Sequence, residues 1–533
     1  MSFVVALVVV TLSGFVSLSY EILWIRVFSF ATGSTPTIFG LVLGVYLAGL
    51  AAGALASRSA LTSASQRSTS YQLRIVAAAL GAAALAGFAV VPGLAWLAAH
   101  GAWKLGLALV LPAAAMFGIV MPVVSHLGIA PEEAVGARLS YLYLASILGS
   151  AIGCLITGFV LTDAWTVADI ARALALTGLG LAAAVAVSEE RRSLRRSRDR
   201  AVRIGALLAL SAATAWLMLA TTQPLFDRLY ERLLYKEAFR DYPRFSEVVE
   251  TRSDIVAVTP DGEIFGGGAY DGYISTDLLN DRNGIVRAYA LAALHPHPRR
   301  VLEIGLSAGS WARVLTQLPG VEHLTSVEIN PGYVRIIAHH AVVRGLLSDP
   351  RFELIIDDGR RWLGRHPAER FDAIVMNMTF HGRAHATNLL STEFMQLARR
   401  HLLAGGVLYF NTTWSPDAAK TALSLFPYGL RCLNFVAVSN APIAFDAGRW
   451  SALLRGLRRE DGRPAFDASD PHATARLDAL LALPGSLGRP PVSYGLETRA
   501  SVLARITNAD VITDDNMLSE WRGTALGKPA LSY

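Results

Sequence analysis

The sequence predicts a protein in two parts, a multi-helix transmembrane domain followed by an α/β domain with a parallel sheet. Seven apolar stretches, most of them about 20 residues long or longer, fill the first 221 positions. Only 14 of the 90 charged residues lie among the first 190 of the 533 positions. After about residue 222, short apolar runs alternate with helical patterns. This composition excludes a disordered chain, a fibrous repeat and, with two cysteines, a disulfide scaffold.

The apolar stretches predict six or seven membrane-spanning helices. The first stretch has no basic region before it and no small-residue cleavage site after it, so we expect a helix and not a removed signal peptide. The stretches lie at residues 3–25, 35–56, 75–99, 105–127, 139–161, 167–188 and 204–221.

Pairs of glycines spaced four residues apart favour close packing of helix backbones over a substrate path. These pairs are Gly40/Gly44, Gly49/Gly53 and Gly149/Gly153.

Glu21 lies inside the first apolar stretch, where a carboxylate is costly unless it is paired or hydrated. Arg26 is the nearest basic residue, and Tyr20 and Trp24 suit a membrane interface. We therefore expect a Glu21–Arg26 ion pair near the headgroups; a proton relay is the alternative.

The net charge of +6 has a single local source. Residues 191–203 carry seven arginines against Asp199, so the rest of the chain is neutral overall. Such a run beside an apolar segment favours a cytoplasmic anchor on anionic headgroups over a nucleic-acid-binding arm, and we expect no nucleic-acid partner. The basic loop 57–74 is expected on the same, cytoplasmic side of the membrane as residues 191–203, because four predicted helices separate the two. If residues 204–221 cross, everything after them lies outside; we nevertheless expect a C-terminal domain in the cytoplasm, below the inner (cytoplasmic) membrane.

The second part reads as strands and helices in alternation. Ile255–Thr259 with the Asp261-Gly262 turn predicts a β-hairpin, and Gly266–Tyr273 predicts a flexible loop. Helices are expected near 284–294 and 311–317. Strands are expected from Arg300, and over Ser326–Asn330, Leu354–Arg360, Ala373–Asn377 and Gly405–Asn411. We therefore divide the chain into a transmembrane domain (1–221), a small β-hairpin region (222–283) and a Rossmann-like domain (284–533).

The ends of these strands carry the candidate chemistry. Gly305 and Gly309 let the backbone approach a ligand, and Glu328 follows 23 positions after Gly305, where an acid accepts hydrogen bonds from ribose hydroxyls. Asp357, Asp358 and Gly359 follow the third strand and could hold an adenine amino group. Glu303, which precedes the turn, completes this set of candidate nucleoside-binding residues. Their order predicts a nucleoside-binding Rossmann-like fold of the class I methyltransferase type. A dinucleotide enzyme or a non-binding relic is the alternative, and the missing third glycine argues against NAD.

Both parts resemble the membrane-fused members of the spermidine synthase (polyamine aminopropyltransferase) family. The similar stretches in the first part are Ser13–Arg26, Leu111-Pro112 with Met121-Pro122, and Leu148–Gly153. In the second part they are residues 301–310, Val327-Glu328, Asp358–Leu363, Asn388–Phe394 and Ile512–Asp515.

The resemblance implies a co-substrate and a set of roles. The family binds decarboxylated S-adenosylmethionine and moves its aminopropyl group to an amine. Gly305, Glu328, Asp358 and Gly359 would hold the nucleoside, and Tyr270 and Asp271 would lie in the loop that closes the amine pocket.

The sequence departs from the family where a base is needed. Family members keep an acid after the fourth strand, and this chain has Asn377 there; an amide cannot act as a base. His381 and His385 follow, and His381 is the candidate replacement, with a surface-loop role as the alternative. Ser307-Ala308 stand in the turn where family members carry Gly or Asp. This difference predicts either weaker nucleoside binding or a change of donor to intact S-adenosylmethionine.

Two functions follow from these observations. The first is a membrane-anchored transferase that alkylates an amine or a membrane-associated, lipid-linked acceptor, with no metal. The second is a non-catalytic membrane protein whose Rossmann domain senses a nucleoside or docks partners. The sequence leaves a homo-oligomer open.

Overall fold

The chain forms two compact units. The computed structural model describes residues 1–62, 69–130, 134–192, 197–377, 382–459, 461–489, 495–516 and 520. Unit 1 comprises residues 1–32, 37–244 and 250–254, and unit 2 comprises residues 33–36, 245–249 and 255–533. Unit 1 ends later than the 221–222 boundary expected from the sequence, because helix α8 continues to Phe226 and the short helix α9 (Leu229–Tyr235) belongs to the same unit.

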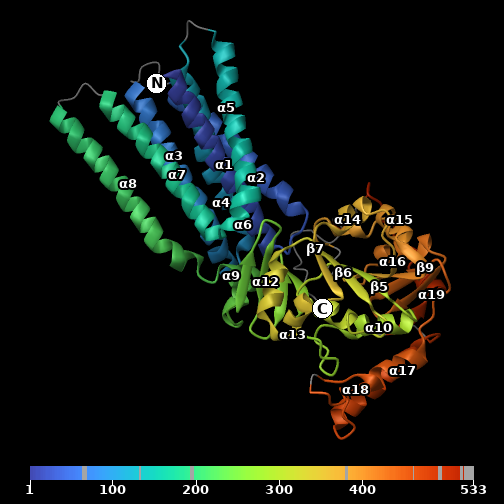
Figure 1. The fold of residues 1–533 in the computed structure, drawn as a ribbon. Coiled ribbons are helices and arrows are strands. Elements are labelled where there is room, and N and C mark those ends of the chain that lie inside the picture. The colour runs from blue at the N-terminus through green and yellow to red at the C-terminus, as the bar shows by residue number, and fades with distance from the viewer. Residues whose placement is uncertain are drawn as a thin grey trace. The chain divides into compact units, whose positions relative to one another are not determined.

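Unit 1 is a bundle of long helices (Figure 1). In the described parts of the chain, seven helical segments are long and apolar enough to span a membrane, which agrees with the expected six or seven. The long helices are α1 (Phe3–Ala31), α2 (Thr37–Thr62), α3 (Thr69–Ala99), α4 (Gly106–Gly128), α5 (Val135–Ile156), α7 (Val167–Arg192) and α8 (Ser197–Phe226). Shorter helical segments are η2 (Trp103–Leu105), η3 (Thr157–Leu161), α6 (Thr162–Ala164) and η4 (Lys236–Arg240).

Two of the three glycine pairs pack helices together. A Cβ at Gly53 of α2 would lie 1.9 Å from the carbonyl oxygen of Ala115, and one at Gly149 of α5 would lie 2.0 Å from that of Thr11. These backbones touch because no side chain intervenes. A Cβ at Gly40 or Gly44 would meet no described atom within 4 Å, so that pair does not mediate packing within the described chain.

The expected ion pair between Glu21 and Arg26 is not formed. Residues five apart on a helix point about 140° apart, so the two side chains leave α1 on different faces. Arg26 donates from Nη2 to the carbonyl oxygen of Thr251 (2.5 Å), while Glu21 is buried. No ion pair within 4.0 Å joins the two among the described residues.

Unit 2 contains a small antiparallel sheet followed by a larger mixed one. The small sheet has the order β1 (Glu247–Glu250), β2 (Ile255–Val258), β3 (Glu263–Gly266) and β4 (Ala269–Tyr273). The predicted hairpin is confirmed as β2 and β3. The predicted loop Gly266–Tyr273 is wrong: Gly267 and Gly268 adopt positive φ angles and make a turn, which lets residues 269–273 pair with β3.

The large sheet has eight strands in the order β12-β10-β11-β9-β8-β5-β6-β7. Strands β5 to β9 are parallel and correspond to the five predicted strands, whereas β10, β11 and β12 are antiparallel and were not predicted. Their bounds are β5 (Arg300–Ile304), β6 (His323–Glu328), β7 (Phe352–Ile356), β8 (Phe371–Met376), β9 (Leu402–Asn411), β10 (Tyr428–Cys432), β11 (Phe435–Ser439) and β12 (Leu496–Thr498).

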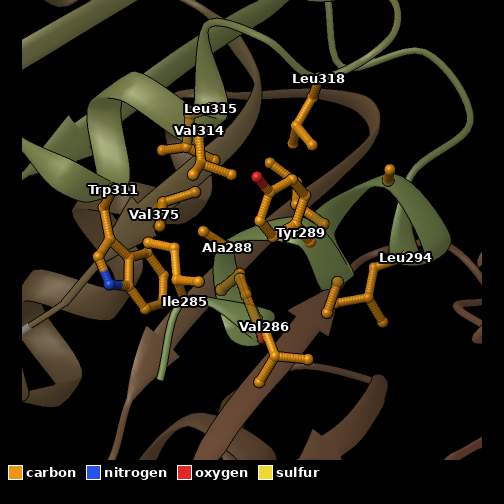
Figure 2. Packing of buried hydrophobic residues seen from close by; sticks show 14 of the residues in the cluster. Ile285, Val286, Ala288, Tyr289, Leu294, Trp311, Val314, Leu315, Leu318 and Val375 are labelled. Atoms are coloured by element: carbon orange, nitrogen blue, oxygen red, sulfur yellow. The ribbon is translucent and has the colours of Figure 1, made fainter. Parts of the chain in front are cut away.

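Helices cover both faces of this sheet and bury an apolar core on each. Figure 2 shows Ile285 and Tyr289 packing beside Trp311 and Val375 on one face. The helices that contribute there are α10 (Val286–Leu294), α11 (Ser310–Leu315), α12 (Gly332–His339), α13 (Ala341–Arg344), α17 (Ala447–Gly456) and α18 (Pro471–Leu481). The other face carries α14 (Gly359–Arg365), α15 (Thr392–Arg400), α16 (Pro416–Leu425) and α19 (Arg499–Arg505). Short 3-10 turns are η5 (Gly345–Ser348), η6 (Ala386–Leu389) and η7 (Leu483–Ser486).

Candidate functional site

The turn that follows β5 has the backbone expected of a ligand-binding loop. Gly305 (φ +88°) and Gly309 (φ +78°) lie in the left-handed region, and so does Ser307 (φ 49°). A Cβ at Gly305 would meet no described atom within 4 Å, so this position opens onto free space. Only a few residue types tolerate such a backbone, and Ser307 is held there with its hydroxyl donating to the carbonyl oxygen of Asp271 (3.0 Å).

Glu328 ends β6 and fastens this turn. Its Oε2 accepts the backbone N–H groups of Leu306 (2.8 Å) and Ser307 (3.2 Å), and its Oε1 accepts that of Asn330 (2.8 Å). The side chain is 5% exposed, and burial raises the pKa of the Glu328 carboxyl to about 7. The expected position at the strand end is confirmed, but most of the hydrogen-bonding capacity of the carboxylate goes to the turn itself. Oε1, with a single backbone donor, retains room for a ligand hydroxyl.

Glu303 lies under the same turn, on β5. The side chain is fully buried, and Ser326 Oγ donates to its Oε2 (2.6 Å) while its Oε1 has no protein partner in the described chain. Burial raises the pKa of Glu303 to about 8, with a contribution from the charge of Glu328. With a pKa of about 8, this carboxyl keeps its proton at neutral pH.

The Asp357-Asp358-Gly359 segment joins β7 to α14. Asp358 caps α14 by accepting the N–H of Arg361 (2.7 Å), and Asp357 forms an ion pair with the Arg361 side chain. A Cβ at Gly359 would lie 2.5 Å from Cγ2 of Ile304, so only glycine lets α14 begin this close to β5. Both acids therefore have structural partners beside the turn after β5.

Tyr270 and Asp271 lie on β4 rather than in a loop. The hydroxyl of Tyr333 donates to the carboxylate of Asp271, and burial, followed by the charge of Asp271, raises the pKa of Tyr333 well above its usual value. The carbonyl oxygen of Asp271 also accepts a hydrogen bond from Ser307 Oγ. This bond connects the small sheet to the turn after β5. Sequence reasoning missed Tyr333, which has no motif of its own.

Asn377 follows β8 and belongs to a chain of hydrogen-bonded side chains. Asn411 Nδ2 donates to Asn377 Oδ1 (3.2 Å), Asn434 Nδ2 donates to Asn411 Oδ1 (2.9 Å), and Arg287 Nη1 donates to Asn434 Oδ1 (2.9 Å). Only Asn377 was predicted. Asn411 was predictable from its position at the end of the fifth strand. Asn434 and Arg287 join this chain of hydrogen bonds from segments that are distant in the sequence, so the sequence does not indicate them.

A cavity of about 650 Å³ lies beside this chain of amides. Tyr270 of β4 lines this cavity, together with Asn411, at the end of β9, and Thr413 and Trp414, which follow it. Arg287, in the first turn of α10, and residues of the loop before α10 complete this part of the lining. A larger groove of about 1380 Å³ lies elsewhere, along residues 274–280 and α17, and contains none of the predicted site residues.

The structure gives little support for a catalytic role of the two candidate histidines. His381 lies outside the described residues. His385 is exposed and has a left-handed backbone (φ 67°) at the start of η6. Within the described ranges, no three His, Cys, Asp or Glu side chains are grouped closely enough to hold a metal ion.

Comparison with known proteins agrees with this arrangement. The family described as the spermine/spermidine synthase domain matches residues 289–418, which contain the turn, Glu328, Asp358 and Asn377. The polyamine aminopropyltransferase of Mycobacterium tuberculosis (strain ATCC 25618 / H37Rv) is 26% identical over 468 residues, which cover 85% of this chain and 86% of that protein. Polyamine aminopropyltransferase 2 of Streptomyces coelicolor is 26% identical over 507 residues, covering 91% and 88% of the two chains.

Among solved structures, a spermidine synthase in complex with the transition state analogue AdoDATO aligns with a TM-score of 0.32 and 19% identity, covering 42% of this chain and 84% of that one. The family match and the long relatives confirm the resemblance: residues 289–418 are similar to the spermine/spermidine synthase domain, and the relatives match most of a chain whose described part also has seven long apolar helices.

Proposed function

We propose that the chain is a membrane-anchored transferase that uses decarboxylated S-adenosylmethionine, or S-adenosylmethionine itself, to alkylate an amine or a membrane-associated acceptor. The observation that supports this most is Glu328, which ends β6 and holds the open turn after β5 through two backbone N–H groups. Ligands of parallel sheets bind beyond the carboxyl ends of the strands. The relatives named as polyamine aminopropyltransferases make the aminopropyl group the first candidate for transfer.

The proposed roles follow from position. Gly305 leaves room for the nucleoside, Glu328 accepts a ribose hydroxyl at Oε1, and Asp357 and Asp358 lie at the adenine end. In the transfer, the acceptor nitrogen attacks the carbon bonded to the sulfonium sulfur, the C–S bond breaks, a thioether nucleoside leaves and one proton leaves the nitrogen. Tyr270, Asp271 and Asn377 would position the acceptor, and His381 is the proposed base.

The proposed location is the inner membrane, with unit 2 in the cytoplasm, where the nucleoside donor is made. The seven apolar helices are compatible with a multi-pass membrane protein. A membrane anchor also suits a lipid-linked acceptor, because a soluble polyamine gives no reason for these helices.

The binding half of the proposal is tested by calorimetry of the full-length protein in detergent with methylthioadenosine and both sulfonium nucleosides. Glu328→Gln should weaken binding at least tenfold, since a hydrogen bond to a charged acceptor contributes about 1.5–3 kcal/mol. Because ionised Glu328 is the better acceptor, wild-type affinity should rise as the pH increases through about 7. Glu322→Gln, an exposed glutamate paired with Arg299, is the matched control. Unchanged affinity in Glu328→Gln would reject the assignment.

A nucleoside-sensing protein without turnover is the second candidate, and Asn377 favours it because family members carry an acid there. The two candidates share nucleoside binding and differ only in product. Release of a thioether nucleoside from the donor, measured with a panel of amines, separates them.

A further inference from the structure

Glu21 of α1 is a buried acid without the partner expected for it. The residue is 4% exposed, and Arg26, the nearest basic residue in the sequence, instead donates to the carbonyl oxygen of Thr251. The described residues supply the Glu21 carboxylate with neither a hydrogen-bond donor nor an ion pair. A carboxylate removed from water is costly unless a donor or a positive charge compensates it. The partner of Glu21 therefore has to come from outside the described residues.

The Glu21 carboxylate is within reach of a small ligand. Fully enclosed oxygens that lack a partner include Glu303 Oε1 and Glu190 Oε2, but neither carboxylate oxygen of Glu21 belongs to this group. Since both oxygens of Glu21 lack a partner, each of them must touch accessible space. Glu21 precedes Ala31, the last residue of α1, by ten positions, which is about 15 Å of helix. The acid is thus accessible well away from the nearer end of the helix.

A hydroxyl pair and aromatic rings lie beside this carboxylate. Ser17 is one turn before Glu21 on the same face of α1, and its Oγ is hydrogen-bonded to the Tyr46 hydroxyl of α2 (2.7 Å). Trp24 is three residues after Glu21, and its ring centroid is 6.4 Å from that of Tyr46. The Tyr46 ring therefore lies along the stretch of α1 that carries Glu21, and the Glu21 and Tyr46 side chains interact electrostatically.

These groups fit an alkylammonium ion better than a metal ion. Ca²⁺ and Mg²⁺ take about six or more oxygen ligands, whereas the described site offers one carboxylate and two hydroxyls that already bond to each other. An ammonium group donates to a carboxylate and is attracted by aromatic ring faces, and the rings also suit the apolar chain of such an amine. A second ammonium group on the ligand would stay uncompensated beside a single carboxylate.

We propose that Glu21, Ser17 and Tyr46 form a binding site for a small monoamine in its ammonium form, within the helix bundle of unit 1. Glu21 pairs with the ammonium group, the hydroxyl pair accepts one of its protons, and the alkyl chain lies along the rings of Tyr46 and Trp24. The site belongs to unit 1, whereas the nucleoside turn belongs to unit 2. The inference therefore does not depend on the proposed transferase function.

Calorimetry of the full-length protein in detergent tests the site with n-butylamine, 1-butanol and 1,4-diaminobutane. The affinity for n-butylamine should be at least tenfold higher than that for 1-butanol, which lacks the charge, and higher than that for 1,4-diaminobutane, whose second charge has no partner. Glu21→Gln keeps the shape of the side chain and removes its charge, so it should weaken n-butylamine binding at least tenfold. Glu237→Gln, the same substitution at an exposed residue of unit 1, should leave this binding unchanged.

A second variant keeps the test decisive if thermal melting shows that Glu21→Gln does not fold. Tyr46→Phe retains the ring and removes the hydroxyl, so it should weaken n-butylamine binding about two- to tenfold. Equal binding of n-butylamine and 1-butanol, tighter binding of 1,4-diaminobutane, or binding of none of the three by the wild type overturns the inference. Unchanged n-butylamine affinity in folded Glu21→Gln, or in Tyr46→Phe where Glu21→Gln does not fold, also overturns it.

Discussion

Two buried glutamates set the charge beneath the turn after β5. Glu303 has a neutral hydrogen-bond partner in Ser326, whereas Glu328 accepts three backbone N–H groups. Burial raises the pKa of both carboxyls, to about 8 for Glu303 and about 7 for Glu328. Hydrogen bonds to the ionised form favour charge on Glu328, so near neutral pH the proton resides on Glu303 and the charge on Glu328.

This division predicts how stability depends on pH. Between pH 4.5 and about 8, folded Glu303 keeps a proton that the unfolded chain has lost, so its contribution makes stability fall as pH rises, by about 1.4 kcal/mol per pH unit at most. Glu303→Gln removes the ionisation. The variant should melt close to the wild type at pH 5 and at a higher temperature at pH 9. Equal melting shifts at both pH values, with Glu322→Gln as the exposed control, would show that Glu303 ionises freely in the folded protein.

At the scale of elements, the C-terminal segment acts as a strap across one face of unit 2. Ile512 accepts the N–H of Thr392 at its carbonyl oxygen (2.8 Å) and donates its own N–H to Thr421 Oγ1 (2.8 Å), so it joins the start of α15 to the middle of α16. Asp514 forms a two-pronged ion pair with Arg360 of α14 (2.7 and 2.5 Å). Arg360 follows Gly359 directly, so the strap is connected to the proposed nucleoside site.

Breaking the ion pair should loosen the strap. Asp514→Asn should lower the free energy of unfolding by about 1 kcal/mol, because the pair is two-pronged but only partly buried. Hydrogen exchange at the Ile512 amide should accelerate, and nucleoside affinity should fall if the strap positions α14. Asp515→Asn changes an exposed neighbour and should do neither. Identical exchange in the two variants would show that Asp514 does not hold the segment.

The elements show what the sequence can and cannot predict. The parallel strands β5 to β9 were predictable because each is an apolar run that ends in a polar or glycine-containing turn, and Glu328 and Asn377 were located with them. Strand β4 was not, because its glycines suggest a loop until β3 supplies a partner. The contacts of Asn411 with Asn434 and of Arg26 with Thr251 join segments 23 and 225 residues apart, and no local pattern encodes them.

At the scale of the molecule, the course of α8 through unit 1 decides on which side of a membrane the chain leaves the bundle. One end of the bundle is marked by the contact of Met1 with Leu127 and by the Arg74–Glu189 ion pair. The other is marked by the contacts Lys236–Ala31, Arg252–Asp163 and Val167–Glu250. Helix α8 begins at Ser197, within the basic run 191–203 and near the first end, and the chain after α8 lies at the second end.

A crossing α8 is incompatible with the expectation that both the basic run and the C-terminal domain face the cytoplasm. The candidate span of α8, Arg198–Phe226, has 29 residues, about 44 Å of helix, which exceeds the hydrocarbon thickness of about 30 Å. The charge rule does not decide the orientation alone, because residues 228–244 carry five Lys and Arg at the opposite end. That rule counts basic residues near the ends of spans and not net charge.

We therefore expect positions 199 and 241, both exposed in unit 1, to lie on opposite sides of the membrane. Asp199→Cys and Asp241→Cys are made in a background with Cys154 and Cys432 replaced by alanine, and intact cells are treated with an impermeant thiol reagent. Residue 241 precedes the long C-terminal part of unit 2, which begins at residue 255, by 14 positions. A cytoplasmic unit 2 therefore requires that only position 199 be labelled, while both react after lysis. Labelling of position 241 alone would place unit 2 outside the cell, away from a cytosolic donor, and would refute the proposed function in its present form. Equal labelling of the two positions would show that α8 does not cross, because a single crossing must separate its ends.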